Sequence, residues 1–329
     1  MNRHCLIAVL LVIILVGCTA PTSEKPVQNT NVTPEGVRIT PDVVYGHKFG
    51  MALTFDVYQP KNQNGAGVIL INSGGWQSPI VNLHKQTAEG LRLLKLKELE
   101  TTVVTRHTGE TVTENMRGCN IEPLLSQGFT VFNVRHGSVP KFKIDEIVLD
   151  LRRAVRFIRF HSNNYGIDAE KIGLWGLSAG GHLALLIGTT ANIGISEATE
   201  AFEKVTGDVA AVVAYYPPND LRGGAEALRK QDPNQLRQLG LDIGDDKLRD
   251  FSPINFASND DPPTLIIHGD NDQVVPVIEG ESMYQALQEA GVESKFIIIP
   301  GAGHGFEGED SDRANAEMMN WFETHLTKK

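Results

Sequence analysis

The five residues Gly176-Leu-Ser-Ala-Gly180 constrain the fold of this chain more than any other stretch. The short apolar run Ile172 to Trp175 precedes them, and a leucine-rich, helix-forming segment follows. Because glycine has no Cβ, Gly176 and Gly180 allow a turn tight enough to expose the hydroxyl of Ser178 at its apex. Gly-x-Ser-x-Gly alone is common in loops, so its context decides. A strand, a sharp turn and a helix are predicted, with Ser178 as a candidate nucleophile.

A serine hydroxyl is a weak nucleophile at neutral pH, so this interpretation requires a base and an orienting carboxylate elsewhere in the chain. Two later apolar runs are typical of buried strands. One is followed by carboxylates and the other by a histidine. The first starts at Thr264 and ends in Asp270 and Asp272. The second starts at Lys295 and enters a glycine-rich loop that contains His304. We expect His304 to act as the general base and a carboxylate to orient it.

Three motifs in this order resemble the α/β-hydrolase family: Gly-Leu-Ser178-Ala-Gly-Gly, His268-Gly-x-x-Asp272 and Gly-His304-Gly-Phe. Within that family the chain resembles the bacterial esterase branch related to feruloyl and acetyl esterases, the BD-FAE-like esterases. The resemblance covers roughly residues 37 to 326. It implies a catalytic triad of Ser178, His304 and Asp272, with the acid in the last position of its motif.

The assignment of the acid leaves two alternatives. Asp270 lies two positions before Asp272, close to the end of the predicted strand. Asp220 follows another apolar strand pattern, residues 209 to 215. Either carboxylate would orient His304 if Asp272 only capped the turn that follows it.

A further candidate is the loop Asn72-Ser-Gly-Gly-Trp76, which follows an apolar run, Gly67 to Ile71, typical of a strand buried on both faces. Small residues let backbone N–H groups approach the oxyanion that forms during acyl transfer. The predicted donors come from four residues: Ser73, Gly74, Gly75 and Ala179. Related esterases usually carry His-Gly-Gly here, so Asn72 and Ser73 depart from the family pattern. A plain glycine turn is the alternative.

Strand-like and helix-like patterns alternate along most of the chain. The runs Val37 to Tyr45 and Met51 to Tyr58 predict an antiparallel hairpin at one sheet edge. An apolar stripe from Ile144 to Ile158 predicts a helix packed on the sheet. Three arginines of this helix are expected to face solvent: Arg152, Arg153 and Arg156. The alternation predicts an α/β fold with a mostly parallel, doubly wound sheet of about eight strands, and a site at their carboxyl ends.

Two segments are candidates for the surroundings of this site. Residues 77 to 122 form a long connection, with helix-forming composition at Leu91 to Leu99 and a hairpin pattern at Thr101 to Thr113. The connection forms either one wall of the substrate site or a surface excursion without a role. The segment Leu221 to Phe256 is polar and partly helical, and is expected to form a small cap.

Composition and charge argue against some classes of partner and cofactor. The 329 residues are 41% hydrophobic and 21% charged, as in a globular protein with one large core. A net charge of −10 without a cluster of Lys or Arg argues against nucleic acid as a partner. The histidines lack paired ligand spacing, so no metal and no cofactor are implied. His136 and Cys119 are expected to be structural.

The N-terminus has the pattern of an export signal. Residues 6 to 16 are apolar, too few to span a bilayer, which takes about 20 helical residues. Leu-Val-Gly-Cys18 resembles a lipoprotein cleavage site; a plain secretory signal with a chance cysteine is the alternative. We expect a signal peptide at 1–17, lipidation of Cys18, a flexible tether at 18–36 and a catalytic domain at 37–329. The protein would then be exported and lipid-anchored to a bacterial membrane, on its periplasmic or extracellular face.

Together these features predict a serine esterase. Its expected substrates are short-chain acyl esters, or acetyl and feruloyl esters of carbohydrates, a class that rests on the resemblance. One alternative is a prolyl-oligopeptidase-like peptidase, although such enzymes generally bear a large N-terminal propeller that this chain is too short to include. The other is a non-catalytic binding protein on the same fold, against which the presence of all three triad residues argues.

Overall fold

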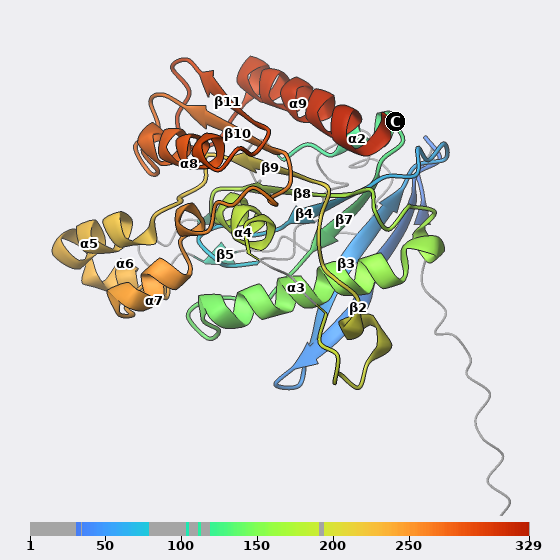
Figure 1. Cartoon of the computed structure of the whole chain (residues 1–329), viewed down its shortest axis with the longest axis horizontal. Coiled ribbons are helices and arrows are strands. Elements are labelled where there is room, and N and C mark those ends of the chain that lie inside the picture. Colours follow the sequence, from blue (N-terminus) through green and yellow to red (C-terminus); the bar gives the residue numbers. More distant parts are fainter. Residues whose placement is uncertain are drawn as a thin grey trace, which may run out of the picture.

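The computed structural model describes residues 31–33, 35–78, 103–104, 111–112, 119–190 and 194–328. A nine-stranded sheet runs through the middle of the molecule, and helices cover both of its faces (Figure 1). The strands, in their order across this sheet, are β1 (Asn31–Val32), β2 (Arg38–Lys48), β3 (Met51–Gln59), β7 (Thr130–Val134), β4 (Gly67–Ile71), β8 (Ile172–Leu177), β9 (Ala211–Tyr215), β10 (Thr264–Gly269) and β11 (Ser294–Ile299).

The sheet has an antiparallel edge and a parallel body. β1, β2, β3 and β7 pair antiparallel, whereas the six strands from β7 to β11 in the sheet order pair parallel. β4 shows why these strands are continuous apolar runs: all five of its residues are buried. Val68 and Leu70 pack into one core, and Ile69 and Ile71 into the other. The predicted mostly parallel α/β sheet is confirmed, with eight strands of five residues or more and the two-residue β1.

Helices on the two faces close these two cores. The helices are α2 (Glu122–Ser126), α3 (Ile144–Phe160), α4 (Ala179–Gly188), α5 (Leu221–Gln231), α6 (Pro233–Gln238), α7 (Asp245–Asp250), α8 (Val277–Glu289) and α9 (Gly308–Phe322), which a last turn, η5 (Glu323–Thr327), continues. Buried residues of α3, α4 and α8 belong to one core, and those of α2 and α9 to the other. The sheet is therefore doubly wound, as expected.

The three arginines of α3 are expected to face solvent, and one of them does not. Arg156 is buried, and Nη1 of its guanidinium lies 3.8 Å from a carboxylate oxygen of Glu203. Arg153 is paired with the same carboxylate. Glu203 lies on a short 3-10 helix, η3 (Ala201–Lys204), that packs against α3. The prediction of a solvated face is wrong for Arg156, because a segment distant in the sequence covers it.

The sheet begins earlier than the expected domain boundary at residue 37. Asn31 and Val32 pair with Ile39 and Arg38, although residues 18–36 have the composition of a tether. A ladder of main-chain hydrogen bonds does not require apolar side chains, so composition does not reveal it. The expected signal peptide and Cys18 lie outside the described residues. Within the described ranges, no helix has both the length and the apolar character to cross a membrane.

The two segments expected around the site are only partly described. Val103–Val104 (β5) pairs antiparallel with Thr111–Val112 (β6), as the hairpin pattern predicts. The stretch Leu91 to Leu99 lies outside the described residues. Between Leu221 and Phe256 the chain forms α5, α6, α7 and a 3-10 turn, η4 (Pro253–Asn255), which confirms the helical character of that segment.

Candidate active site

The turn at Ser178 has the strained geometry that the sequence predicts. β8 is buried along its whole length, and Ser178 directly follows it. The φ of 52° and ψ of −121° at Ser178 lie outside the usual regions for a residue with a Cβ. The turn is possible because backbones approach closely on both sides. A Cβ on Gly176 would lie 2.1 Å from the carbonyl oxygen of Gly180, and one on Gly180 would lie 2.6 Å from that of Ile71. Ser178 thus stands at the N-terminus of α4.

We expect Gly176→Ala to prevent this turn. The added methyl would overlap main-chain atoms, which cannot rotate away as a side chain can, so the cost should be at least about 3 kcal/mol. Gly223→Ala is the matched control, because Gly223 lies in α5 and a Cβ added there would enter open space. That exchange should stabilise the protein by about 0.5–1 kcal/mol. Urea unfolding of both variants measures the difference, and equal stabilities would contradict the close-approach argument.

The structure brings the three predicted triad residues together. Nε2 of His304 lies 2.9 Å from Oγ of Ser178, and its Nδ1 lies 2.8 Å from Oδ2 of Asp272. A carboxylate only accepts hydrogen bonds, so the imidazole proton belongs on Nδ1 and leaves Nε2 free to accept the serine proton. Ser178 follows β8, Asp272 follows β10 and His304 follows β11, so all three lie at the carboxyl ends of parallel strands.

The loop around Asp272 fixes its carboxylate. Oδ1 accepts the N–H groups of Val274 and Val275 at 2.8 and 2.9 Å, which leaves Oδ2 for His304. Burial alone would raise the pKa of Asp272. Hydrogen bonds from His268, His304 and the Val275 N–H outweigh burial and hold that pKa well below its usual range. The carboxylate is therefore ionised at neutral pH.

Neither alternative acid contacts His304 within the described part of the chain. Oδ1 of Asp270 accepts the N–H of Gly301 at 2.6 Å, which ties the ends of two strands together. Asp220 caps α5 by accepting the N–H of Arg222 at 3.0 Å, and it pairs with the guanidinium of the same residue. The geometry favours Asp272 over both.

The predicted oxyanion loop lies directly beside the turn at Ser178. The N–H of Gly180 donates to the carbonyl of Ser73 at 3.2 Å, so the loop and the first turn of α4 are joined. Gly74 must be removed from the predicted donors, because its N–H donates to the carbonyl of Gln77 at 2.9 Å. Sequence composition could not reveal this internal bridge. Ser73, Gly75 and Ala179 remain predicted donors, and Ala179 starts α4, where N–H groups lack intrahelical partners.

Tyr216 contributes to the site and is missing from the sequence prediction. Its ring meets the imidazole of His304 edge-on, with 4.7 Å between centroids. It has a φ of 38°, and its N–H donates to Ile267 at 2.7 Å. The ring therefore restrains the orientation of the imidazole. The only sequence signal is its position directly after the buried strand β9.

His136 and Cys119, both expected to be structural, are buried. Nδ1 of His136 lies 2.7 Å from the carbonyl of Gly137, and burial lowers the pKa of its imidazole to about 4. Burial raises the pKa of the Cys119 thiol to about 12. Neither group is charged at neutral pH, which suits a structural role.

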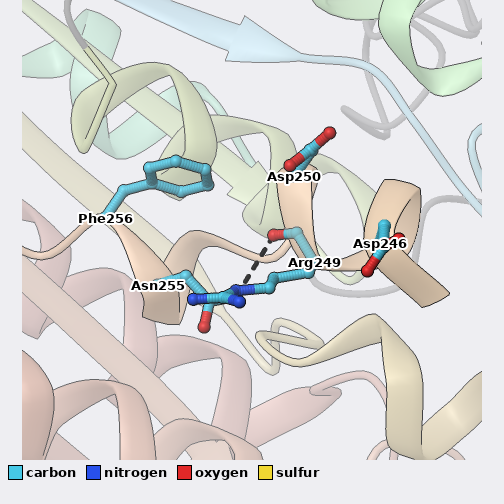
Figure 2. A pocket seen from close by; sticks show the side chains of 5 residues that line it. All are labelled: Asp246, Arg249, Asp250, Asn255 and Phe256. Atoms are coloured by element: carbon cyan, nitrogen blue, oxygen red, sulfur yellow. Dashed lines mark hydrogen bonds between the residues drawn. The ribbon is translucent and has the colours of Figure 1, made fainter.

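The helical segment 221–256 borders the oxyanion loop. A Cβ on Gly75 would lie 3.1 Å from Cδ2 of Leu239, which follows α6. A cavity of about 430 Å³ lies in the same segment, and no triad residue lines it. Figure 2 shows the side chains around it. Its walls are Asp246, Arg249, Asp250, Asn255 and Phe256. Within the described ranges, no group of three or more His, Cys, Asp or Glu side chains could hold a metal ion.

Comparison with known families agrees with this arrangement. The BD-FAE family model matches residues 106–287, which is more than half of the 329 residues. The chain belongs to the BD-FAE family. A second model, described as TAP-like protein, matches residues 249–328 of this BD-FAE member. The prediction of an α/β-hydrolase of the esterase branch is confirmed.

The relatives of this BD-FAE member include proteins named as esterases and one named as a peptidase. Esterase LipC of Mycobacterium tuberculosis is 32% identical over 195 residues, which are 58% of this chain and 48% of LipC. A solved structure, "Truncated form of carbohydrate esterase from gut microbiota", superposes with a TM-score of 0.62 at 25% identity, covering 88% of this chain and 96% of that one. "Uncharacterized peptidase YuxL" of Bacillus subtilis is 35% identical over 95 residues, 27% of this chain and 14% of YuxL. This chain therefore spans about half the length of LipC and a smaller part of YuxL.

Proposed function

We propose that this protein is a serine esterase that cleaves carboxylic esters through an acyl-enzyme. The observation that carries the proposal is the continuous hydrogen-bonded path from Ser178 Oγ through His304 to Asp272, with distances of 2.9 and 2.8 Å. A path of this kind allows one imidazole to take the serine proton and then return it to the leaving group. The family membership and the names of the relatives support the same reaction.

In the proposed reaction, Ser178 Oγ attacks the ester carbonyl while its proton moves to Nε2 of His304. The resulting oxyanion is stabilised by backbone N–H groups, for which Ala179 and the loop residues Ser73 and Gly75 are the proposed donors. The C–O bond to the alcohol then breaks, and the alcohol leaves with the proton from His304. A water molecule, deprotonated by His304, then attacks the acyl carbon. The bond from that carbon to Ser178 Oγ breaks, His304 returns the proton to Oγ, and the acid is released. Asp272 stays ionised and holds the imidazole throughout.

Esters are favoured over amides because the relatives with the longest matches are named as esterases. The proposed substrates are short-chain acyl esters, or acetyl and feruloyl esters of carbohydrates, in keeping with the carbohydrate esterase whose structure superposes on this chain. A peptidase is the second candidate, supported by the 95-residue match to YuxL. The triad itself serves both leaving groups, so only substrates can separate them.

The test is a substrate panel for the purified protein. It contains p-nitrophenyl acetate, butyrate and octanoate, methyl ferulate, an acetylated xylo-oligosaccharide and a peptide p-nitroanilide. The proposal expects kcat/KM to be highest for an acetyl, butyryl or feruloyl ester. Faster cleavage of the anilide than of every ester would favour the peptidase, and absence of ester turnover would overturn the proposed function.

We also propose that the protein is exported and anchored through a lipid on Cys18, on the basis of the apolar stretch before Leu-Val-Gly-Cys18. Cys18→Ser should release the protein from the membrane fraction of a bacterial host that processes lipoproteins. Intact-mass measurement of the mature protein provides the direct reading. A mature chain that starts at an unmodified residue, or at a site other than Cys18, would refute the anchor.

A further inference from the structure

His182 is a buried histidine of α4 that takes no part in the reaction described above. Its side chain has no exposed surface. Nδ1 lies 3.2 Å from Nε1 of Trp76, and Nε2 lies 2.7 Å from the carbonyl oxygen of Phe251. An indole N–H can only donate and a carbonyl can only accept, so the imidazole must carry its proton on Nε2 and accept at Nδ1. Both ring nitrogens are thus satisfied in one tautomer.

Burial keeps the imidazole neutral, and its two hydrogen-bond partners select the tautomer. Burial lowers the pKa of His182 to about 4, so the ring is neutral at neutral pH and Nδ1 remains an acceptor. A protonated ring would turn an N–H of its own toward the indole N–H of Trp76. The hydrogen bond between the two side chains therefore persists under the conditions in which an esterase is assayed.

The two partners of His182 belong to segments far apart in the sequence. Trp76 ends the oxyanion loop, where Gly75 and Trp76 have φ values of 54° and 59°. The Trp76 ring meets that of His182 edge-on, with 5.5 Å between centroids. Phe251 directly follows α7, in the helical segment 221–256. His182 therefore contacts both the oxyanion loop and that segment from the nucleophile helix.

The oxyanion loop needs such a restraint. Two consecutive residues in the left-handed region store strain, most of it at Trp76 because Gly75 lacks a Cβ, and strain persists only where surrounding contacts determine the conformation. Oxyanion donors are effective only if they already point at the position of the developing charge. The hydrogen bond from the indole N–H of Trp76 to His182 connects this loop to α4 and provides such a restraint.

We propose that His182 is a positioning residue, which holds the oxyanion loop in register with Ser178 through its hydrogen bond to Trp76. This role rests on the proposed esterase function, since it concerns the donors of that reaction. The main-chain N–H of His182 donates to the carbonyl of Ser178 at 2.9 Å, at the start of α4. Its imidazole instead hydrogen-bonds with Trp76 and Phe251, so the side chain acts through Trp76 and the loop. Loss of the contact should lower kcat much more than it raises KM, because the oxyanion exists only in the reaction and not in the bound substrate.

Three substitutions separate the two hydrogen bonds. His182→Gln keeps a donor that reaches the carbonyl of Phe251 but offers no acceptor at the position of Nδ1. His182→Asn keeps an oxygen near the position of Nδ1 and does not reach Phe251. Trp76→Phe keeps the aromatic ring and removes the N–H. We expect His182→Gln and Trp76→Phe each to lower kcat by about 10- to 100-fold, with KM within about threefold of wild type.

A double-mutant cycle tests whether the two residues act through one contact. The double variant should be no slower than the slower single variant, because the second change removes nothing more. His182→Asn should recover most of the lost kcat, since its oxygen can accept from Trp76. His325→Gln is the matched control. His325 also packs on a tryptophan, Trp321, with 4.4 Å between ring centroids, but it lies in η5, the last turn of the chain, and not in α4. Its kcat should equal that of wild type.

The kcat of each variant must be corrected for unfolded protein. Each kcat is referred to the fraction of protein whose Ser178 is labelled to completion by an organophosphate, so partial unfolding does not count as slow turnover. If the deficit disappears after this correction, or if the two single variants lose activity independently, His182 only fills the core and the positioning role is overturned. Wild-type kcat in His182→Gln also overturns it. If wild type and Ser178→Ala hydrolyse esters equally slowly, the proposed function itself fails.

Discussion

Ser178→Ala should lower kcat for p-nitrophenyl acetate by about a million-fold and leave the protein folded. The serine hydroxyl lies within hydrogen-bond distance of His304, whereas the backbone of Ser178 is held by its N–H bond to the carbonyl of Tyr215 at 2.9 Å. Alanine keeps that backbone bond and has the same Cβ in the same strained conformation. The change therefore removes the nucleophile and little packing. Single-turnover kinetics, with circular dichroism and thermal unfolding of the same sample, measure both parts of the expectation.

Ser282→Ala is the control for loss of a serine hydroxyl. Oγ of Ser282 donates to the carbonyl of Ile278 within α8 at 2.8 Å, so it contributes to the helix and not to the reaction. Its kcat should remain within about twofold of wild type, since a local hydrogen bond of this kind contributes about 1 kcal/mol or less to stability. Comparable activity of Ser178→Ala and Ser282→Ala, both folded, would refute the proposed mechanism.

The sequence predicts the parts of the fold that depend on local pattern. The apolar runs at β4 and β8 reveal strands buried on both faces, because no solvent-facing position interrupts them. The turn at Ser178 is predictable because close backbone approach there admits only glycine at positions 176 and 180. The triad follows from the order of three motifs, since strand ends of a parallel sheet meet at one edge.

Other features depend on contacts between distant segments, and the sequence pattern does not contain them. Arg156 has the spacing of an exposed helix position, but Glu203 and its helix cover it. The N–H of Gly74 is lost to an internal bridge of its own loop. His182 and Tyr216 lie next to recognised motifs, but the sequence does not reveal their contacts with Trp76 and His304. A side chain's partner is set by topology as much as by its own type.

Asp272→Asn should lower kcat by about ten-thousand-fold, and the structure explains why the amide is so damaging. One carboxylate oxygen accepts two backbone N–H groups, from Val274 and Val275. The oxygen of the new amide must stay there, so its NH₂ group faces Nδ1 of His304. Nδ1 then has to accept, which moves the imidazole proton to Nε2. An Nε2–H cannot take the proton of Ser178, so the base is lost although the geometry survives.

Asp270→Asn and Asp220→Asn are the matched controls for the same chemical change. The new amide oxygen at position 270 can still accept the N–H of Gly301, and the one at 220 can still cap α5. Each should keep kcat within about tenfold of wild type, because a capping or surface carboxylate contributes only about 1 kcal/mol. Steady-state kinetics on the three folded variants distinguish the acids. An almost unaffected Asp272→Asn beside a severely impaired Asp270→Asn or Asp220→Asn would show that another carboxylate orients His304, and that the 2.8 Å contact of Asp272 serves only to shape its loop.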